Sequence, residues 1–145
     1  METPQDSAMI ALLPQTDEWC KIDPAHTTIV YLGKVAELDP SLKDLLIKIV
    51  SSIAILTNPF PVKIVGKETF GEDQVEVFRL VKTPELSSLR TLLDNWDDSE
   101  FPIFKPHATI GPEGTVVENP PLFLMFDRIM LGWGEERLIF WFRRF

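Results

Sequence analysis

The sequence contains few residues that could form a disulfide or bind a metal ion. It has one cysteine, Cys20, and two histidines among 145 residues. A single cysteine excludes an internal disulfide and favours a reducing compartment, so we expect a cytoplasmic protein. We predict no cofactor and no metal site, because two histidines without cysteines at ligand spacing make a poor ligand set. A hydrophobic content of 45% instead predicts one domain with a core, over residues 1–145.

Positive charge and long apolar runs are also scarce. The net charge of −8 argues against duplex DNA or other long nucleic acid held on a wide basic surface. No apolar run is long enough for a membrane span, and no signal peptide is evident. Four carboxylates gather in residues 94–100, which we interpret as a solvated loop rather than a metal site. The sequence does not show whether this loop covers a cleft.

Both histidines occur in one pattern, in which a histidine is followed by any residue, then Thr, then Ile, at 26–29 and 107–110. Both segments are predicted to be strands, because the first continues as a β-branched and aromatic run and the second is bounded by prolines. Side chains alternate between the faces of a strand, so His and Thr of each motif should share a face, about 7 Å apart. Two such strands facing each other would supply two imidazoles and two hydroxyls to one pocket.

Such a pocket suits cleavage of a phosphodiester without a metal. His26 and His107 titrate near neutrality, so one could accept a proton while the other donates one. The hydroxyls of Thr28 and Thr109 could donate hydrogen bonds to phosphoryl oxygens. The alternative is structural, because Thr is common in strands and a histidine on an apolar face is usually a core residue.

The paired motifs resemble the signature of the 2H phosphoesterase superfamily, which includes RNA 2',3'-cyclic phosphodiesterases and the so-called 2'-5' RNA ligases. The flanks are similar too, with His-Thr-Thr-Ile-Val-Tyr-Leu-Gly at 26–33 and Phe-Lys-Pro-His at 104–107. The resemblance implies a bilobal α+β fold, with two antiparallel sheets around a central cleft, flanking helices and a pseudo-two-fold axis. It also implies that the two histidines are the acid–base pair and that the motif threonines bind phosphoryl oxygens.

The implied activity is that of a phosphodiesterase, and its substrate stays open. The candidates are RNA with a 2',3'-cyclic end, a small 2'-5'-linked or cyclic-phosphate nucleotide, and a cyclic oligonucleotide, since small viral members of the superfamily degrade bacterial defence signals. The acidic charge disfavours long RNA relative to small nucleotides. The alternative is a non-catalytic module of the same fold that binds or sequesters nucleotides, although a pure binder needs no proton donor and acceptor.

Two further residues are candidates for substrate contacts. Lys105 precedes the second motif and could meet a phosphate, and Trp133, expected in a turn, could stack on a base. A solvated lysine and a structural tryptophan are the ordinary alternatives. We expect Tyr31 in the core, and the aromatic residues at 140–142 and 145 in the core or packed at the chain end.

Helix starts and breaks divide the rest of the chain. Asp39-Pro40 and Thr83-Pro84 each pair an N-cap residue with a first-turn proline ahead of an amphipathic stretch, and the first helix should end before Asn58-Pro59. Gly66 is a candidate site for a bulge. The expected strands are 8–13, a short one near 18–22, 26–32, 61–70, 75–81, 106–111, 122–131 and 137–142, with turns at 71–73, 112–121 and 132–134.

Overall fold

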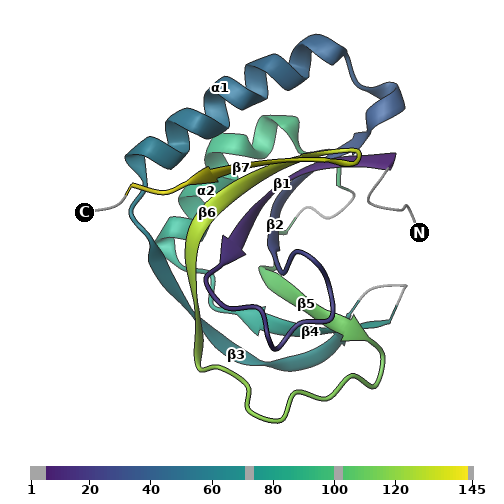
Figure 1. The fold of residues 1–145 in the computed structure, drawn as a ribbon, viewed down its shortest axis with the longest axis vertical. Coiled ribbons are helices and arrows are strands. Elements are labelled where there is room, and N and C mark those ends of the chain that lie inside the picture. Colours follow the sequence, from purple (N-terminus) through teal and green to yellow (C-terminus); the bar gives the residue numbers. More distant parts are fainter. Residues whose placement is uncertain (1–5, 71–73, 100–102, 144–145) are drawn as a thin grey trace.

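The computed structural model describes residues 6–70, 74–99 and 103–143, which form seven antiparallel strands and two α-helices (Figure 1). The fold is therefore α+β, as expected. The expected turn at 71–73 lies outside the described residues. The elements are β1 (Ser7–Pro14), β2 (Thr27–Lys34), η2 (Val35–Glu37), α1 (Pro40–Leu56), β3 (Phe60–Phe70), β4 (Val75–Leu80), α2 (Pro84–Leu93), η3 (Asp94–Trp96), β5 (His107–Pro112), β6 (Phe123–Trp133) and β7 (Glu136–Trp141).

Both predicted helix starts are confirmed. The Asp39 carboxylate accepts a hydrogen bond of 2.9 Å from the Ser41 amide, and the Thr83 hydroxyl accepts one of 3.2 Å from the Leu86 amide. Each contact satisfies an amide that has no partner inside the helix. The first helix ends at Leu56, before Asn58-Pro59. The buried positions recur at helical spacing in both helices: Leu46, Val50 and Ala54 in α1, and Leu86, Leu89 and Leu93 in α2.

The strands follow the order β2-β1-β6-β3-β4-β5 with β7 added to β6, so the two expected antiparallel sheets are joined into one. The strand β3 joins the two parts, because residues 60–63 pair with β6 and residues from 64 onward pair with β4. Its register on β4 shifts between Ile64 and Gly66, at the predicted bulge, and a bulge bends the strand that carries it. The sheet curves, with β6, β1 and β2 on one side and β3, β4 and β5 on the other (Figure 1).

Two connections differ from the sequence expectation. Residues 18–22 form no strand. Their backbone is attached to β5 by a hydrogen bond of 2.7 Å, which the Lys21 amide donates to the Ile110 carbonyl. The expected turn at 132–134 is wrong for its first two residues, since β6 continues through Trp133. The chain turns only at Gly134, whose φ of +63° favours glycine.

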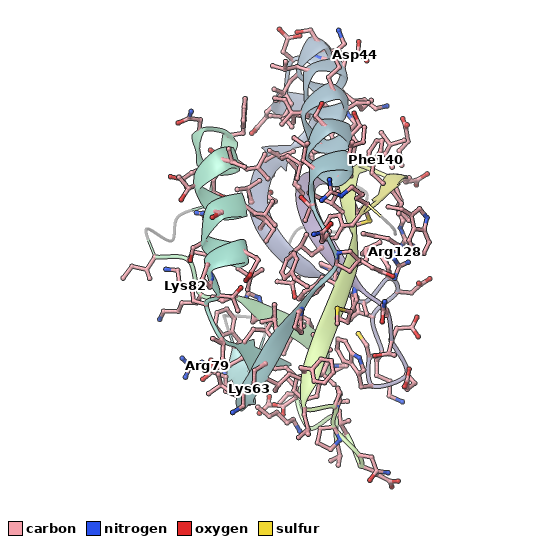
Figure 2. The ribbon with its side chains drawn as sticks, turned by 90° about the vertical axis from the view of Figure 1, so that its left-hand side faces the viewer. Asp44, Lys63, Arg79, Lys82, Arg128 and Phe140 are labelled. Carbon is pink, nitrogen blue, oxygen red and sulfur yellow. The ribbon has the colours of Figure 1, made fainter. Side chains whose placement is uncertain are left out.

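The main core lies between the sheet and the two helices, and Figure 2 shows both helices along one flank of the molecule. The helix α1 packs against β6 and β7, and α2 packs against β2. A smaller apolar cluster, formed by Ala11, Leu13 and Met130 with Met9 packed against it, occupies the opposite face of β1 and β6. Side chains on that opposite face are therefore directed away from the main core. Within the described residues, no helix is long and apolar enough to cross a membrane.

Candidate active site

The two motifs lie on β2 and β5, and these two strands contact each other although they are not paired in the sheet. His26 lies directly before β2, and His107 is the first residue of β5. In each motif the histidine and the threonine two residues after it, Thr28 or Thr109, are partly exposed. The residue between them and the isoleucine after them are buried. This burial pattern agrees with the alternation expected of a strand, so each motif presents one imidazole and one hydroxyl on the side away from the main core.

The two imidazoles are held by equivalent hydrogen bonds. Nδ1 of His26 lies 2.8 Å from the Pro24 carbonyl oxygen, and Nδ1 of His107 lies 2.9 Å from the Lys105 carbonyl oxygen. In both cases the partner is the residue two positions earlier. A carbonyl oxygen only accepts, so Nδ1 carries the proton on each ring and Nε2 is left to exchange one. The sequence predicted the shared face but not this tautomer.

The strands that carry the two histidines contact each other, and positive charge around His26 affects its pKa. Burial, which disfavours the charged ring, lowers the pKa of His26, and the hydrogen bond to Pro24 opposes this effect. The positive charges of His107 and Arg137 lower the same pKa further. The fold therefore brings together the imidazoles of two motifs that are distant in the chain, together with a cation that the sequence analysis did not select.

The motif threonines differ in their partners. The Thr28 hydroxyl lies 3.6 Å from the thioether sulfur of Met9, a weak acceptor, which places it beside the smaller apolar cluster. The Thr109 backbone carbonyl accepts a hydrogen bond of 3.1 Å from the thiol of Cys20. Burial raises the pKa of that thiol, so it stays protonated as a donor. Thr27, between His26 and Thr28, has a buried hydroxyl without a partner in the described part of the chain.

Next to His107, one aromatic contact was not anticipated. The ring of Phe70, at the end of β3, lies 4.4 Å from the His107 ring between centroids, tilted by 31°. No spacing in the sequence links these two positions. Lys105 is exposed, and its backbone carbonyl rather than its side chain is what touches His107. Its ammonium group thus remains a candidate for a surface contact with a phosphate.

The two tryptophans near the end of the chain differ in exposure, and the turn expected at one of them is wrong. Trp133 lies within β6 and is only 9% exposed, among the core side chains, because the strand runs two residues further than expected. That burial leaves little of its indole for a base. Trp141, expected in the core or packed at the chain end, is 51% exposed, since Phe140 and Phe142 take the core positions on either side of it. Its ring lies 5.0 Å from the Arg128 guanidinium. Tyr31, also expected in the core, is partly exposed.

Arg137 on β7 is the cation missed from the sequence. Its Nη2 donates a hydrogen bond of 3.0 Å to the backbone carbonyl of Asp23, three residues before His26. Its Nη1 lies 3.8 Å from the Asp23 carboxylate, and its side chain is 48% exposed. Nothing in the spacing of the chain signals this contact, because it depends on β7 lying in the same sheet as β2.

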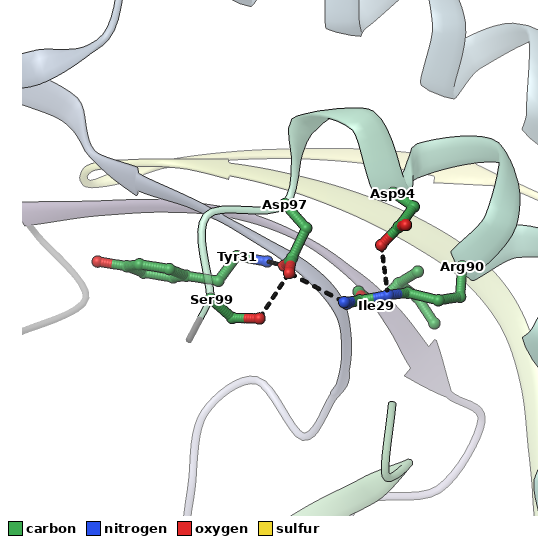
Figure 3. A network of polar contacts seen from close by, with 6 residues as sticks. All are labelled: Ile29, Tyr31, Arg90, Asp94, Asp97 and Ser99. Atoms are coloured by element: carbon green, nitrogen blue, oxygen red, sulfur yellow. Dashed lines mark hydrogen bonds and ion pairs between the residues drawn. The ribbon is translucent and has the colours of Figure 1, made fainter. Parts of the chain in front are cut away.

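The acidic stretch is solvated at Asp94 and Asp98, as expected, but not at Asp97; Glu100 lies outside the described residues. Figure 3 shows the carboxylate of Asp97 accepting hydrogen bonds of 3.0 Å from the Tyr31 amide and 2.9 Å from Arg90 Nη2. Arg90 Nη1 also donates to the Ile29 carbonyl at 2.7 Å. The stretch thus supplies partners to the outer edge of β2. Among the described residues, no group of three or more His, Cys, Asp or Glu could hold a metal ion.

The described cavities lie apart from the motif residues. One, of about 400 Å³, is lined by residues of two connections, at 16–21 and 115–121. The other, of about 440 Å³, is an apolar groove between α1 and α2. Neither is lined by a motif histidine or threonine.

Solved structures confirm the expected fold. The chain is similar to Escherichia coli LigT complexed with NADP+, at a TM-score of 0.62 and 15% identity over 96% of this chain and 98% of that one. It is also similar to TT0787 of Thermus thermophilus, at 0.58 and 14% over 86% of each chain. A third similar structure is described as a phosphoesterase, at 0.54 and 14% over 97% of each chain. No family model and no curated protein matches the sequence.

Proposed function

We propose that this protein is a phosphodiesterase of the 2H type, in which two histidines cleave a nucleotide phosphodiester without a metal. The observation that carries the proposal is the matched pair of Nδ1 hydrogen bonds at His26 and His107, which leaves Nε2 of both rings for proton transfer. The likeness to LigT and to a phosphoesterase supports a phosphoesterase-type enzyme. We propose that residues 1–145 act as one catalytic domain in the cytoplasm.

The surroundings of the two rings suit different roles. Burial and neighbouring positive charge lower the pKa of His26 and favour its neutral form, which can accept a proton. We therefore assign His26 as the general base and His107 as the general acid. His26 Nε2 takes a proton from water, or from a neighbouring 2'-hydroxyl, as that oxygen attacks phosphorus. The bond to the leaving ribose oxygen breaks, and His107 Nε2–H protonates that oxygen. Thr28 and Thr109 donate hydrogen bonds to the non-bridging oxygens.

A small nucleotide or an RNA end is the proposed substrate. LigT has been solved in complex with 3'-AMP, with ATP and with NADP+, which supports a nucleotide ligand for the same fold. The net charge of −8 supports a short substrate over a long one. The proposed class covers 2',3'-cyclic phosphates, 2'-5' linkages and cyclic oligonucleotides. Cyclic oligonucleotides would be the substrates if the protein is a viral enzyme that degrades bacterial defence signals.

A product assay in EDTA tests this proposal. The panel holds 2',3'-cyclic mononucleotides, RNA with a cyclic phosphate end, 2'-5' dinucleotides and cyclic di- and trinucleotides. We expect cleavage of one class, and a loss of about 10²–10⁴-fold in both His26→Ala and His107→Ala. Activity that disappears in EDTA and returns with an added metal would overturn the mechanism. Binding of the panel without any product would favour the nucleotide-binding module instead.

A further inference from the structure

Arg137 lies on the same face of the sheet as the first motif. On β7, the side chains of Leu138 and Phe140 pack against the main core, so Arg137 and Ile139 are directed to the opposite face. The register partner of Ile139 is Met130, and cross-strand partners share a face. Met130 belongs to the smaller apolar cluster, which also includes Met9, the partner of the Thr28 hydroxyl. The face that presents Thr28 therefore continues across β1 and β6 to β7.

The guanidinium of Arg137 reaches the segment that leads into the first motif. It donates to the Asp23 carbonyl at 3.0 Å and has the Asp23 carboxylate at 3.8 Å. That carboxylate is 94% exposed, so the ion pair is screened by water and contributes little. A guanidinium carries about five N–H donors in a planar fork. The contact with the Asp23 carbonyl engages Nη2, and about half of the side chain is open to solvent.

We propose that Arg137 binds a non-bridging phosphoryl oxygen of the substrate, on the His26 side of the site. The inference rests on the proposed phosphodiesterase function and adds a residue to it. A guanidinium matches the geometry of a phosphate and keeps its charge at every working pH. Neither the two threonine hydroxyls nor a neutral His26 supplies such a charge. Arg137 also makes the two otherwise matched motifs unequal, because its charge acts on the ring assigned as the base.

The variants that test this are Arg137→Gln, which removes the charge and the fork, and Arg137→Lys, which keeps the charge alone. Arg143→Gln is the matched control, because it removes another arginine from the same end of the chain. Arg143 donates to the Asn58 side chain at 3.2 Å, away from both motifs. The probes are inorganic phosphate, 3'-AMP and uncharged adenosine. Binding is followed by NMR of the histidine side chains, which is direct because the chain has two histidines.

We expect Arg137→Gln to weaken phosphate and 3'-AMP binding by about tenfold or more, since hydrogen bonds to charged groups are the strong ones. Arg137→Lys should lie between it and the wild type, while adenosine binding and the Arg143→Gln variant should be unaffected. The pKa of His26 in the free protein should rise in Arg137→Gln, because a neighbouring positive charge has been removed. With the cleaved substrate, kcat/KM should fall by a similar factor.

Phosphate binding to Arg137→Gln at wild-type affinity would overturn the inference. A merely structural role for Arg137 would lower the melting temperature of Arg137→Gln and weaken adenosine and phosphate alike, which would also overturn it. Failure of the proposed function has a different signature. A wild-type protein that binds phosphate through Arg137 but cleaves no substrate would overturn the phosphodiesterase and leave the anion site standing.

Discussion

At the scale of single residues, adjacent threonines of the first motif have opposite environments. The Thr28 hydroxyl is partly exposed beside His26, whereas the Thr27 hydroxyl is buried without a partner in the described residues. An unpaired buried hydroxyl costs about 1–3 kcal/mol. Thr28 is therefore expected to serve function and to add little stability, whereas Thr27 is expected to lower stability without serving function.

Replacing each threonine by valine, which has nearly the same shape, separates these two effects. Thr28→Val should lower kcat/KM by about tenfold or more, because it removes a donor to a charged phosphoryl oxygen, and Thr28→Ser should restore most of it. Thr27→Val should raise the free energy of unfolding by about 1 kcal/mol at unchanged activity. Urea unfolding and steady-state kinetics measure both. Equal losses of activity in the two valine variants would contradict the assignment.

His26 should also make stability depend on pH. Its pKa is lowered in the folded protein by burial, so the unfolded chain binds a proton more readily than the folded one. The contribution of His26 to the free energy of unfolding should therefore be constant above the ordinary histidine pKa of about 6.5 and fall as the pH drops through it. Glu76 and Asp97, whose pKa values are lowered by their hydrogen-bond partners, lose their contributions only at more acidic pH.

The measurement is thermal melting across this range for the wild type and for His26→Gln, whose side chain does not titrate. The decrease in melting temperature between pH of about 7.5 and about 5.5 should be smaller in the variant. A decrease of the same size in both proteins would show that His26 is not the group responsible.

At this scale, sequence reasoning predicted the shared strand face of His26 with Thr28 and of His107 with Thr109, because that placement follows from alternation along one strand. It could not reach the imidazole tautomers, because these depend on where the Pro24 and Lys105 carbonyls lie in space. Arg137 was out of reach for the same reason, since a contact between β7 and the segment before β2 leaves no pattern in the chain.

At the scale of elements, α2 and η3 brace the strand that carries the first motif. Arg90 on α2 and Asp97 after η3 form an ion pair of 2.9 Å, with side chains only 15% and 7% exposed, and both also bond the backbone of β2 (Figure 3). Because β2 is an edge strand, these contacts satisfy groups that a neighbouring strand would otherwise take. The sequence showed a cluster of carboxylates, but it did not show that one of them would bind the backbone of the edge strand β2.

Removing one partner of this pair should be costly. Asp97→Ala should lower the free energy of unfolding by about 3 kcal/mol, because it leaves a largely buried guanidinium and a strand amide without their acceptor. The matched control is Asp94→Ala, which removes the 62% exposed carboxylate at 3.2 Å from the same arginine and should cost less than about 1 kcal/mol. Urea unfolding of both variants measures the difference. Equal losses in the free energy of unfolding would show that the Arg90–Asp97 pair adds no stability.

The helix caps are the elements that the sequence predicted best. Asp39 and Thr83 each stand before a proline, and each accepts the expected amide hydrogen bond. Thr83→Ala should lower the free energy of unfolding by about 1 kcal/mol, and Asp39→Ala should lower it as well, whereas glycine at these positions should cost less than alanine. Denaturant unfolding of the four variants checks this, and alanine variants as stable as the wild type would argue against capping by the side chain.

At the scale of the whole molecule, the pairing of the strand β3 is what the sequence could not predict. The two predicted parts of the sheet exist, but one long strand belongs to both, with a register shift between them at Gly66. Periodicity finds a strand and its bulge, yet it cannot tell which neighbours the strand will pair with, because pairing is decided by distant segments. The α+β class was predictable from the alternation of strands and capped helices, and the continuity of the sheet was not.

The charge of the whole molecule predicts an unusual salt dependence. With a net charge of −8, the protein should repel a substrate that carries several phosphates, and added salt screens this repulsion. We expect kcat/KM for a cyclic trinucleotide to rise between about 0.02 and about 0.2 M NaCl, and to rise less for a 2',3'-cyclic mononucleotide. A steep fall with salt for the trinucleotide would instead indicate a basic binding surface.

The matched carbonyl contacts of the two imidazoles have a consequence for successive turnovers. In the proposed reaction one ring begins neutral and the other protonated, and each ends in the state in which its counterpart began. Both Nδ1 atoms are bonded to backbone oxygens, so each ring exchanges its proton at Nε2, and a change of tautomer, which leaves the charge of a ring unchanged, restores neither of them. The enzyme after one turnover is thus ready for the reverse reaction, and must exchange a proton with solvent at each ring before it can repeat the forward one.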